Sequence, residues 1–461
     1  MDIMTQNTEL TRGLYYVDSP ASFFAALGNN DNEIDIVVTS AFILNGKVKF
    51  PEGSNISISS AESDSPQAII RGFLGDMFEI PAGTSVSLTD IVIAGDNASY
   101  TDASGSLFLV SGSADGAQPS LTIGRGATLR DNQTNTSYGM SSTGGVRVVA
   151  GTVLLEEGGT ITKNNSAANN SVGGVALFGP ESRLVMRGGE ISHNAGQFGS
   201  GVYVDVPARF DMYGGSIVYN ISTPGGHGAG VDAAGTFNMY GGSISYNSSS
   251  DGGGLSVHST GNVNIHSGSF IGNTAPGAGG HGAGILFLQP PDNDLIIGME
   301  GGTVNFTDNI SGGPGGAIGT SSIQDLRRLY VGPNVTFSGN KASQGYFMTN
   351  PNEIDIYDSR IQAVQVSEPF QYAYNGYDIQ YSEYQPDVYA VQFNSIGGSM
   401  VPPQAVDGGH TAVRPRDPVR GCDIFSGWFR DITFTLPWDF VMPVNSNMLL
   451  YAKWIPNACS A

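Results

Sequence analysis

Apolar residues recur along this chain at regular intervals, and each is followed three positions later by an asparagine. This unit occurs eight times, at Leu129–Asn132, Ile161–Asn164, Ile191–Asn194, Ile217–Asn220, Ile244–Asn247, Phe270–Asn273, Phe306–Asn309 and Phe337–Asn340. The three central intervals between asparagines are 26, 27 and 26 residues, and the outer intervals are longer, as loop insertions would make them. A fixed period of this length is typical of a solenoid in which each period forms one coil.

Further features keep phase with the asparagine. In one period, Phe210 and Met212 alternate with polar residues, Gly214-Gly215 follows, the apolar-x-x-Asn unit comes next, and Gly230-Val231 opens another apolar run after a loop. Alternation places one side chain inside and the next outside. Glycine permits the positive φ that sharp corners need. Each period therefore predicts three short strands separated by turns.

Three strands per period predict an all-β chain folded as a right-handed parallel β-helix. Strands of successive coils would stack about 4.8 Å apart around a narrow apolar interior. The asparagines can hydrogen-bond to their copies one coil away, and this residue type also tolerates the left-handed backbone region. A propeller blade would need about 40 residues and four strands, and the consensus of a leucine-rich repeat is absent.

The N-terminal region fits the same solenoid less regularly. Strand-like runs occur at Ile34–Val38, Val48–Phe50, Ile56–Ile58, Ala68–Ile70, Val86–Ile93 and Leu107–Val110. Before them, Ser19 to Gly28 reads as a helix, with Ser19 at the N-cap, Pro20 in the first turn and Gly28 at the end. We expect this helix to cap the open apolar end of the solenoid. The prediction is an N-terminal segment with a capping helix at 1–29 and a β-helix at 30–384.

Composition and charge narrow the possible partners. Glycine accounts for 65 of 461 residues, only 13% are charged and 40% are apolar, which fits a glycine-rich repeat. The net charge of −21 repels phosphate backbones, so nucleic acid is a poor partner. No apolar run of about 18 residues exists, so no membrane span is predicted.

The Gly-Gly-x-Ile-x-x-Asn coils resemble those of bacterial and archaeal adhesin-like right-handed β-helix proteins. The resemblance covers roughly residues 30–380 and implies the fold. It leaves the function open, because the same fold carries adhesins, polysaccharide lyases and hydrolases.

The C-terminal segment closely resembles the internalin-type B-repeat, also called the Listeria–Bacteroides repeat. The motifs that carry the resemblance are Val391–Gly398, Gln404–Gly409, Gly421–Phe425, Gly427–Phe429, Trp438–Phe440 and Leu450–Trp454. It implies a small β-grasp-like domain at 385–456, before a tail at 457–461, on an extracellular protein. Cys422 stands where the family usually has Tyr, and one extra residue precedes Phe425, which puts the local strand register in doubt. Trp428, Trp438 and Trp454 are expected to be core aromatics.

The two cysteines, Cys422 and Cys459, make neither a disulfide framework nor a cysteine-based zinc site. The sequence leaves open whether they pair with each other. We predict a secreted or cell-surface location from the resemblance. Any export signal and anchor are expected to lie outside this sequence.

One column of side chains has the chemistry of a binding face. Arg187, Tyr213, Tyr240 and His266 occupy equivalent outward positions in successive coils, with Tyr219 and Tyr246 at the corners that follow. Exposed tyrosines with an arginine and a histidine could stack sugar rings. The plainer alternative is cross-strand stacking that only stabilises the surface. The corner positions do not fix which way Tyr219 and Tyr246 face.

A second column contains metal-ligand types. His227, Asp251 and His281 fall at equivalent positions in three successive coils. Such a column could bind a divalent metal or serve as an acid–base pair. The alternative is a duplicated glycine-rich turn whose histidines face water. We therefore expect no cofactor apart from a possible divalent metal at this column.

These features favour an adhesin or binding stalk, with a glycan or a protein on another surface as its partner. A β-helix lyase or hydrolase would need clustered carboxylates with Arg or Lys on one face, and the strands are poor in such clusters. No catalytic residue is predicted, and the chain is expected not to be an enzyme. A polysaccharide-active enzyme and a purely structural surface component stay open as alternatives.

Overall fold

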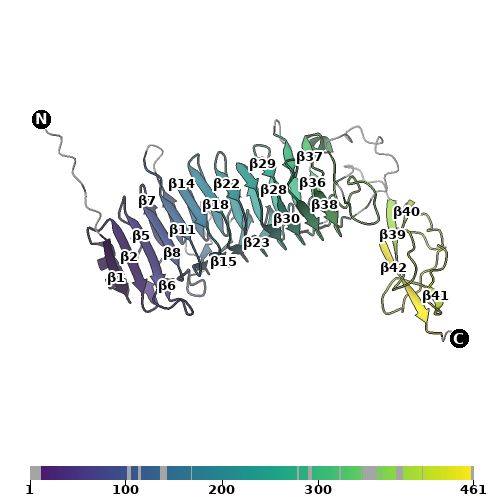
Figure 1. The fold of residues 1–461 in the computed structure, drawn as a ribbon, viewed down its shortest axis with the longest axis horizontal. Coiled ribbons are helices and arrows are strands. Elements are labelled where there is room, and N and C mark those ends of the chain that lie inside the picture. Colours follow the sequence, from purple (N-terminus) through teal and green to yellow (C-terminus); the bar gives the residue numbers. More distant parts are fainter. Residues whose placement is uncertain are drawn as a thin grey trace.

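The computed structural model describes residues 12–100, 105–112, 116–134, 143–167, 169–277, 280–288, 293–320, 323–343, 345, 361–363, 365–380, 388–407 and 409–457. Figure 1 shows a long stack of parallel strands followed by a small β domain at the C-terminal end. The predicted parallel β-helix is confirmed, because every strand of the stack pairs in parallel with its copies in the neighbouring coils.

Three sheets run along the solenoid, and most coils add one strand to each. Sheet 1 contains β1 (Arg12–Val17), β2 (Glu33–Val38), β5 (Asn55–Ser60), β8 (Ser85–Thr89), β11 (Ser120–Ile123), β14 (Val146–Leu155), β18 (Ser182–Met186), β22 (Arg209–Met212), β26 (Thr236–Met239), β29 (Asn262–Ile265), β33 (Leu295–Ile297) and β37 (Leu329–Val331). Sheet 2 contains β3 (Phe42–Leu44), β6 (Ala68–Arg71), β9 (Val92–Ala94), β12 (Thr128–Arg130), β15 (Thr160–Thr162), β19 (Glu190–Ser192), β23 (Ser216–Val218), β27 (Ser243–Ser245), β30 (Gly268–Ile271), β34 (Val304–Thr307) and β38 (Val335–Ser338). Sheet 3 contains β4 (Val48–Lys49), β7 (Phe78–Pro81), β10 (Phe108–Ser111), the first half of β14, β17 (Val175–Leu177), β21 (Val202–Val204), β25 (Val231–Ala233), β28 (Leu255–Val257), β32 (Ile285–Phe287) and β36 (Ile318–Thr320).

Short extra strands lie between sheets 2 and 3 in several coils, which the sequence pattern did not predict. They are β13 (Gln133–Thr134), β16 (Asn165–Ser166), β20 (Ala195–Phe198), β24 (Ile221–His227), β31 (Thr274–Ala275) and β35 (Ile310–Ser311). They fall in the glycine- and serine-rich loops after each asparagine. Their pairing continues the stacking of the coils through regions that looked like irregular loops.

The interior is a continuous apolar core that runs along the stack. Phe210 and Phe237 lie in equivalent positions of adjacent coils, with ring centroids 4.9 Å apart and planes 21° apart. Phe270, Phe306 and Phe337 form a similar ladder. Each of these rings is fully buried, so burial of apolar surface and ring stacking both stabilise the contact between coils.

The buried asparagines form the hydrogen-bonded ladder that the repeat predicts. The Nδ2 group of Asn194 donates to Asn220 Oδ1 at 3.0 Å and to the backbone oxygen of Ile161 at 3.0 Å. The backbone N–H of Asn194 also donates to Asn220 Oδ1, at 3.0 Å. The same pattern joins Asn220 to Asn247. Each amide therefore satisfies backbone and side-chain groups that the coil corner would otherwise bury without partners.

The left-handed backbone at this corner belongs to the residue before the asparagine. His193, Tyr219 and Tyr246 have φ values of 54°, 57° and 54°. Asparagine thus contributes its amide group at this corner, and the residue before it adopts the left-handed conformation. Glycine holds the strained position in two other coils, at Gly272 and Gly339.

The predicted helix is α1 (Pro20–Leu27), and it begins with a capping box between Ser19 and Ser22. Phe23 is fully buried against Phe42 and Phe78, so the helix closes the apolar end of the stack. Strand β1 precedes the helix and pairs in parallel with β2. The solenoid sheet therefore starts inside the segment that the sequence analysis assigned to the N-terminal cap.

At the other end, a 3-10 helix, η2 (Ile323–Arg328), precedes the last strand of sheet 1. The asparagine ladder stops at Asn340, whose Nδ2 donates to Asp378 Oδ1 at 3.1 Å. Asp378 also accepts from the Ser367 hydroxyl at 2.6 Å and from Asn375 Nδ2 at 2.8 Å. Its burial raises the pKa of the Asp378 carboxyl, although these hydrogen bonds oppose the shift.

The C-terminal domain is a four-stranded mixed sheet in the order β40 (Gln404–Asp407), β39 (Val388–Asn394), β42 (Met448–Ile455) and β41 (Ile424–Phe429). Trp428 is buried in its core, and Trp438 and Trp454 are partly buried against it. The register shifts between Phe425 and Gly427, close to the extra residue noted in the sequence. Cys422 is disulfide-bonded, and Cys459 lies outside the described residues.

We predict that Asn220→Ala destabilises the solenoid by about 3 kcal/mol, because the N–H and Nδ2 groups of Asn194 lose their acceptor in a buried site. Urea unfolding followed by circular dichroism would measure the change. Asn334→Ala removes an exposed amide that donates to Gly301 and should cost less than about 0.5 kcal/mol. Equal losses in the two variants would contradict a structural role for the ladder.

Candidate functional site

The outer surface of sheet 1 carries the predicted aromatic column over β22, β26 and β29. The rings of Tyr213 and Tyr240 stack with centroids 4.8 Å apart and planes 11° apart. His266 stacks on the far side of Tyr240, at 4.6 Å and 10°. The backbone N–H of each of these residues donates to the preceding coil, so strand pairing fixes the ring spacing. The three residues form one aromatic stack.

This geometry limits how the aromatic stack can bind a ligand. Tyr240 has a ring on each side, so neither of its faces is open. Tyr213 is the terminal ring, and its second face points toward the preceding coil, where Arg187 holds the equivalent position. Tyr213 is 49% exposed, which agrees with one open ring face. Tyr240 is 36% exposed, which agrees with exposure of its ring edges alone.

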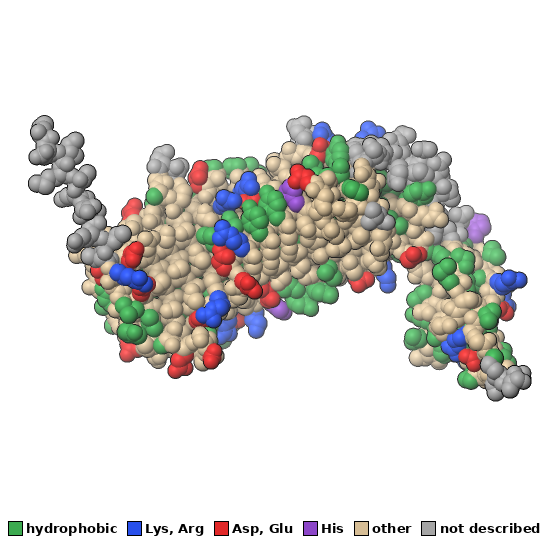
Figure 2. Space-filling view, in the orientation of Figure 1, with side chains coloured by type: hydrophobic (Ala, Val, Ile, Leu, Met, Phe, Trp, Pro, Cys, Tyr) green, Lys and Arg blue, Asp and Glu red, His purple; other side chains and the backbone are tan. Residues whose placement is uncertain are grey.

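A shallow groove of about 550 Å³ lies beside the open face of Tyr213. Its lining residues come from β14, β18 and the turns that follow β18 and β22; they are Thr152, Leu154, Arg183, Val185, Arg187 and Tyr213. We call this the arginine–tyrosine groove. Figure 2 shows basic and acidic side chains over the middle coils, on a surface where most other side chains are uncharged.

A buried carboxylate positions the guanidinium groups at this groove. Asp211 Oδ2 accepts from Arg183 Nη2 at 2.7 Å, from Arg183 Nε at 3.1 Å and from Arg209 Nε at 2.7 Å. Its Oδ1 accepts from Asn238 Nδ2 at 2.9 Å. Burial acts to raise the pKa of Asp211, but the hydrogen bonds from Arg209, Asn238 and Arg183 outweigh it, so the pKa lies below its ordinary value.

Arg187 is held more loosely than Arg183. Its Nη1 lies 2.9 Å from Glu156 Oε1, and its side chain is 57% exposed. A surface pair of this kind contributes little to stability and rearranges readily. Arg187 can therefore turn toward a ligand at small cost.

Tyr219 and Tyr246 form a different stack. Their rings lie 5.3 Å apart at 17°, and His193 packs against Tyr219 at 5.2 Å. They occupy the left-handed corner after sheet 2, so strand β23 separates Tyr219 from Tyr213. The six predicted binding residues are thus not one site, because only Arg187 and Tyr213 line the groove, while Tyr240 and His266 support it.

The side chains of the predicted metal column do come together, around Asp251. His281 Nδ1 lies 3.3 Å from Asp251 Oδ1, and His227 Nδ1 lies 3.9 Å from Asp251 Oδ2. The His281 backbone N–H also donates to Asp251, and the His227 ring stacks on Phe198 at 5.7 Å. Within the described part of the chain, no group of three or more His, Cys, Asp or Glu side chains is arranged to hold a metal ion. His227 Nδ1 is buried and makes no hydrogen bond with the described residues. Metal binding at this column stays a prediction.

The sequence pattern does not predict a neighbouring pair, His258 and Asp232. His258 Nε2 lies 2.5 Å from Asp232 Oδ1, and Asp232 is fully buried on the outer side of sheet 3. Burial acts to lower the pKa of His258, but the hydrogen bond to Asp232 and the negative charge of Asp232 together outweigh it and raise the pKa. The alternation in β25 does place Asp232 outward. Its burial depends on tertiary packing, which the sequence pattern does not show.

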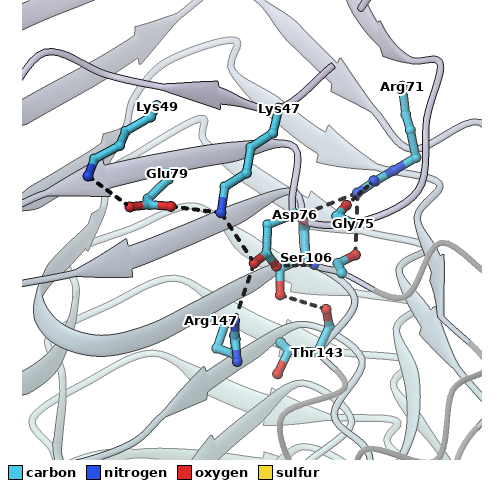
Figure 3. Close-up of polar contacts among 10 residues, drawn as sticks. Lys47, Lys49, Arg71, Gly75, Asp76, Glu79, Ser106, Thr143 and Arg147 are labelled. Carbon is cyan, nitrogen blue, oxygen red and sulfur yellow. Dashed lines mark hydrogen bonds and ion pairs between the residues drawn. The ribbon is translucent and has the colours of Figure 1, made fainter. Parts of the chain in front are cut away.

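A third polar network is structural. The guanidinium of Arg71 is fully buried and donates to the backbone oxygens of Gly105 and Ser106 at 3.3 and 3.1 Å, and also to Phe73 and Gly75 (Figure 3). Desolvation lowers the pKa of Arg71 to about 10. Nearby, Asp76 pairs with Arg147 at 3.3 Å. These contacts fix the loop after β6 to the next coils.

Comparison with known proteins identifies the C-terminal domain. Residues 389–453 match the family model of the Listeria-Bacteroides repeat domain, which confirms the resemblance seen in the sequence. Two curated relatives come from Evansella cellulosilytica. A "Putative Gly-rich membrane protein" is 39% identical over 75 residues, or 16% of this chain and 9% of that protein. A "Putative membrane protein" is 37% identical over 75 residues, or 16% of this chain and 11% of that protein.

The matched part of the chain spans about a tenth of the length of these relatives. No solved structure matches the chain. Within the described residues, no helix has the length and apolar character needed to cross a membrane. The repeat domain is of a kind typical of surface proteins, and the relatives are named as membrane proteins, so the comparisons suggest a surface protein.

We predict that Asp211→Asn lowers the free energy of unfolding by about 2 kcal/mol at pH 7, because an amide cannot accept all the hydrogen bonds that the carboxylate accepts. The folded-state pKa is lowered, so the carboxylate contribution is complete above the unfolded value near 4 and fades as the pH falls through the folded value. The stability gap between wild type and variant should therefore shrink between pH 5 and pH 2.

Urea unfolding of both proteins across that pH range measures the gap. Asp64→Asn changes an exposed carboxylate and should stay within about 0.5 kcal/mol of wild type throughout. A gap for Asp211→Asn that is independent of pH would rule out its charge as the cause.

Proposed function

We propose that this chain is a surface-displayed binding protein whose β-helix presents the arginine–tyrosine groove to a glycan. The observation that carries the proposal is the place of Tyr213, a terminal ring of the aromatic stack, beside the two arginines that line the groove. A sugar ring packs its C–H face on an aromatic ring, and the polar groups around the ring fix its orientation. Leu154 and Val185 supply further apolar contact in the groove.

The rest of the molecule fits a display role. Parallel stacking gives a long, stiff body, which supports a binding face at a distance from an attachment point (Figure 1). The repeat domain and the membrane-protein relatives support an extracellular or cell-surface setting. The net charge of −21 keeps such a body soluble and away from nucleic acids.

The groove chemistry favours binding over catalysis. Glycoside hydrolysis needs two carboxyl groups on either side of the scissile bond, and none of the groove's lining residues is a carboxylate. Asp211, which holds Arg183, is buried with a lowered pKa, so it is a poor proton donor. Glu156 is paired with Arg187. We therefore propose a binding protein that leaves its ligand intact.

We predict that Tyr213→Ala weakens glycan binding by about tenfold or more, because the groove loses the aromatic ring that lines it. A glycan array followed by titration of the hits, with analysis for released oligosaccharides, measures both affinity and cleavage. Tyr219→Asn is the matched control, since it removes an equally exposed tyrosine of the other stack and asparagine tolerates the left-handed corner.

Loss in Tyr213→Ala with retention in Tyr219→Asn, and no cleavage, supports the proposal. Oligosaccharide release would instead make the chain an enzyme. Binding that is equally unaffected by both variants would move the site elsewhere on the molecule.

A further inference from the structure

The arginine–tyrosine groove concentrates positive charge on a strongly acidic chain. Arg183 and Arg187 both line it, with side chains 45% and 57% exposed, although Lys and Arg make up only 20 of the 461 residues. Arg183 and Arg209 share the single carboxylate of Asp211. Two guanidinium groups on one carboxylate leave a surplus of positive charge beside the groove.

The shared carboxylate also sets the orientation of Arg183. Its Nε and Nη2 atoms both bind Asp211 Oδ2, so that edge of the planar group is occupied. A guanidinium has five N–H donors, and the edge that carries Nη1 makes no hydrogen bond with the described residues. Because two bonds fix the plane, this edge is oriented before any ligand arrives. Asp211 is thus a positioning residue for Arg183.

We infer that the groove recognises an acidic sugar, namely a pyranose ring that carries a carboxylate, as in a uronate polysaccharide. This inference rests on the proposed glycan-binding function and names its ligand class. The sugar ring packs on the open face of Tyr213, and its carboxylate accepts hydrogen bonds from Arg183 and Arg187. A guanidinium matches the planar geometry of a carboxylate with paired N–H donors.

A neutral alternative fits the surface less well. A neutral sugar would gain from Tyr213 and the apolar floor, but it would form no charge-assisted hydrogen bonds with the Nη1 edge of Arg183 or with the exposed guanidinium of Arg187. One sugar ring with a single carboxylate matches the one tyrosine and the two arginines that line the groove.

The test compares acidic polymers with their neutral counterparts. Polygalacturonate, alginate and hyaluronan, each alongside its carboxyl-reduced form, are titrated against the full chain at low and moderate salt. We expect at least tenfold tighter binding of at least one acidic polymer than of its reduced form, with a preference that weakens as salt rises.

Arg187→Gln is the main variant, because Arg187 makes only an exposed ion pair and its loss should leave the fold intact. It should remove most of the acid preference, while Arg187→Lys should restore part of it. Arg125→Gln, which removes an exposed arginine paired with Asp90 in another coil, is the matched control and should bind as wild type does.

The outcomes separate the two ideas. Equal affinity for acidic and reduced polymers, lost in Tyr213→Ala, would overturn the acidic ligand and leave glycan binding standing. An acid preference that survives Arg187→Gln and Arg183→Gln would also overturn it. No binding of any acidic, reduced or neutral glycan would overturn both the ligand class and the proposed function.

Discussion

The hydrogen-bonded contact between one coil and the next is the constraint on which the rest of this structure depends. A parallel stack leaves a corner in every coil where backbone groups turn inward, away from water. The buried asparagine resolves this by accepting from the preceding coil and donating to a backbone carbonyl as well as to the next asparagine. Because an unsatisfied buried polar group costs as much as a lost hydrogen bond, the amide fixes the register of each coil on its neighbour.

Fixed register has a consequence on the outside of the solenoid. Equivalent positions of successive coils lie one strand spacing apart. Identical side chains at these positions therefore form columns as a direct result of strand pairing. Tyr213, Tyr240 and His266 stack for this reason. Within a column, each ring covers a face of its neighbour. An open ring face can therefore occur only at an end of the column. The change from Tyr213 to Arg187 in the preceding coil is such an end, and the groove lies there.

The same register explains how charges come together on an acidic chain. Arg183 and Arg209 are directly paired across β18 and β22, and Asp211 lies beside them at the next outward position. Two like charges in adjacent strands would repel, and the buried carboxylate between them offsets this. Asp211 is held in its ionised form, and it gives the guanidinium groups of Arg183 and Arg209 a defined orientation. An arrangement of this kind suits recognition of an anion better than proton transfer.

The sequence alone determined the fold class, because a period of 26 or 27 residues with a recurring apolar position and asparagine fits stacked coils and little else. It also placed Tyr213, Tyr240 and His266 in one column and located the helix that begins at Ser19, since these depend on periodicity and local capping. It missed Asp211 and Asp232, because their burial and their partners come from contacts between coils. His227, Asp251 and His281 were correctly aligned, but alignment gives only spacing along the stack. Whether side chains at that spacing converge on an ion, on one another or on an open groove is decided by their directions in the folded chain, which only the tertiary structure contains.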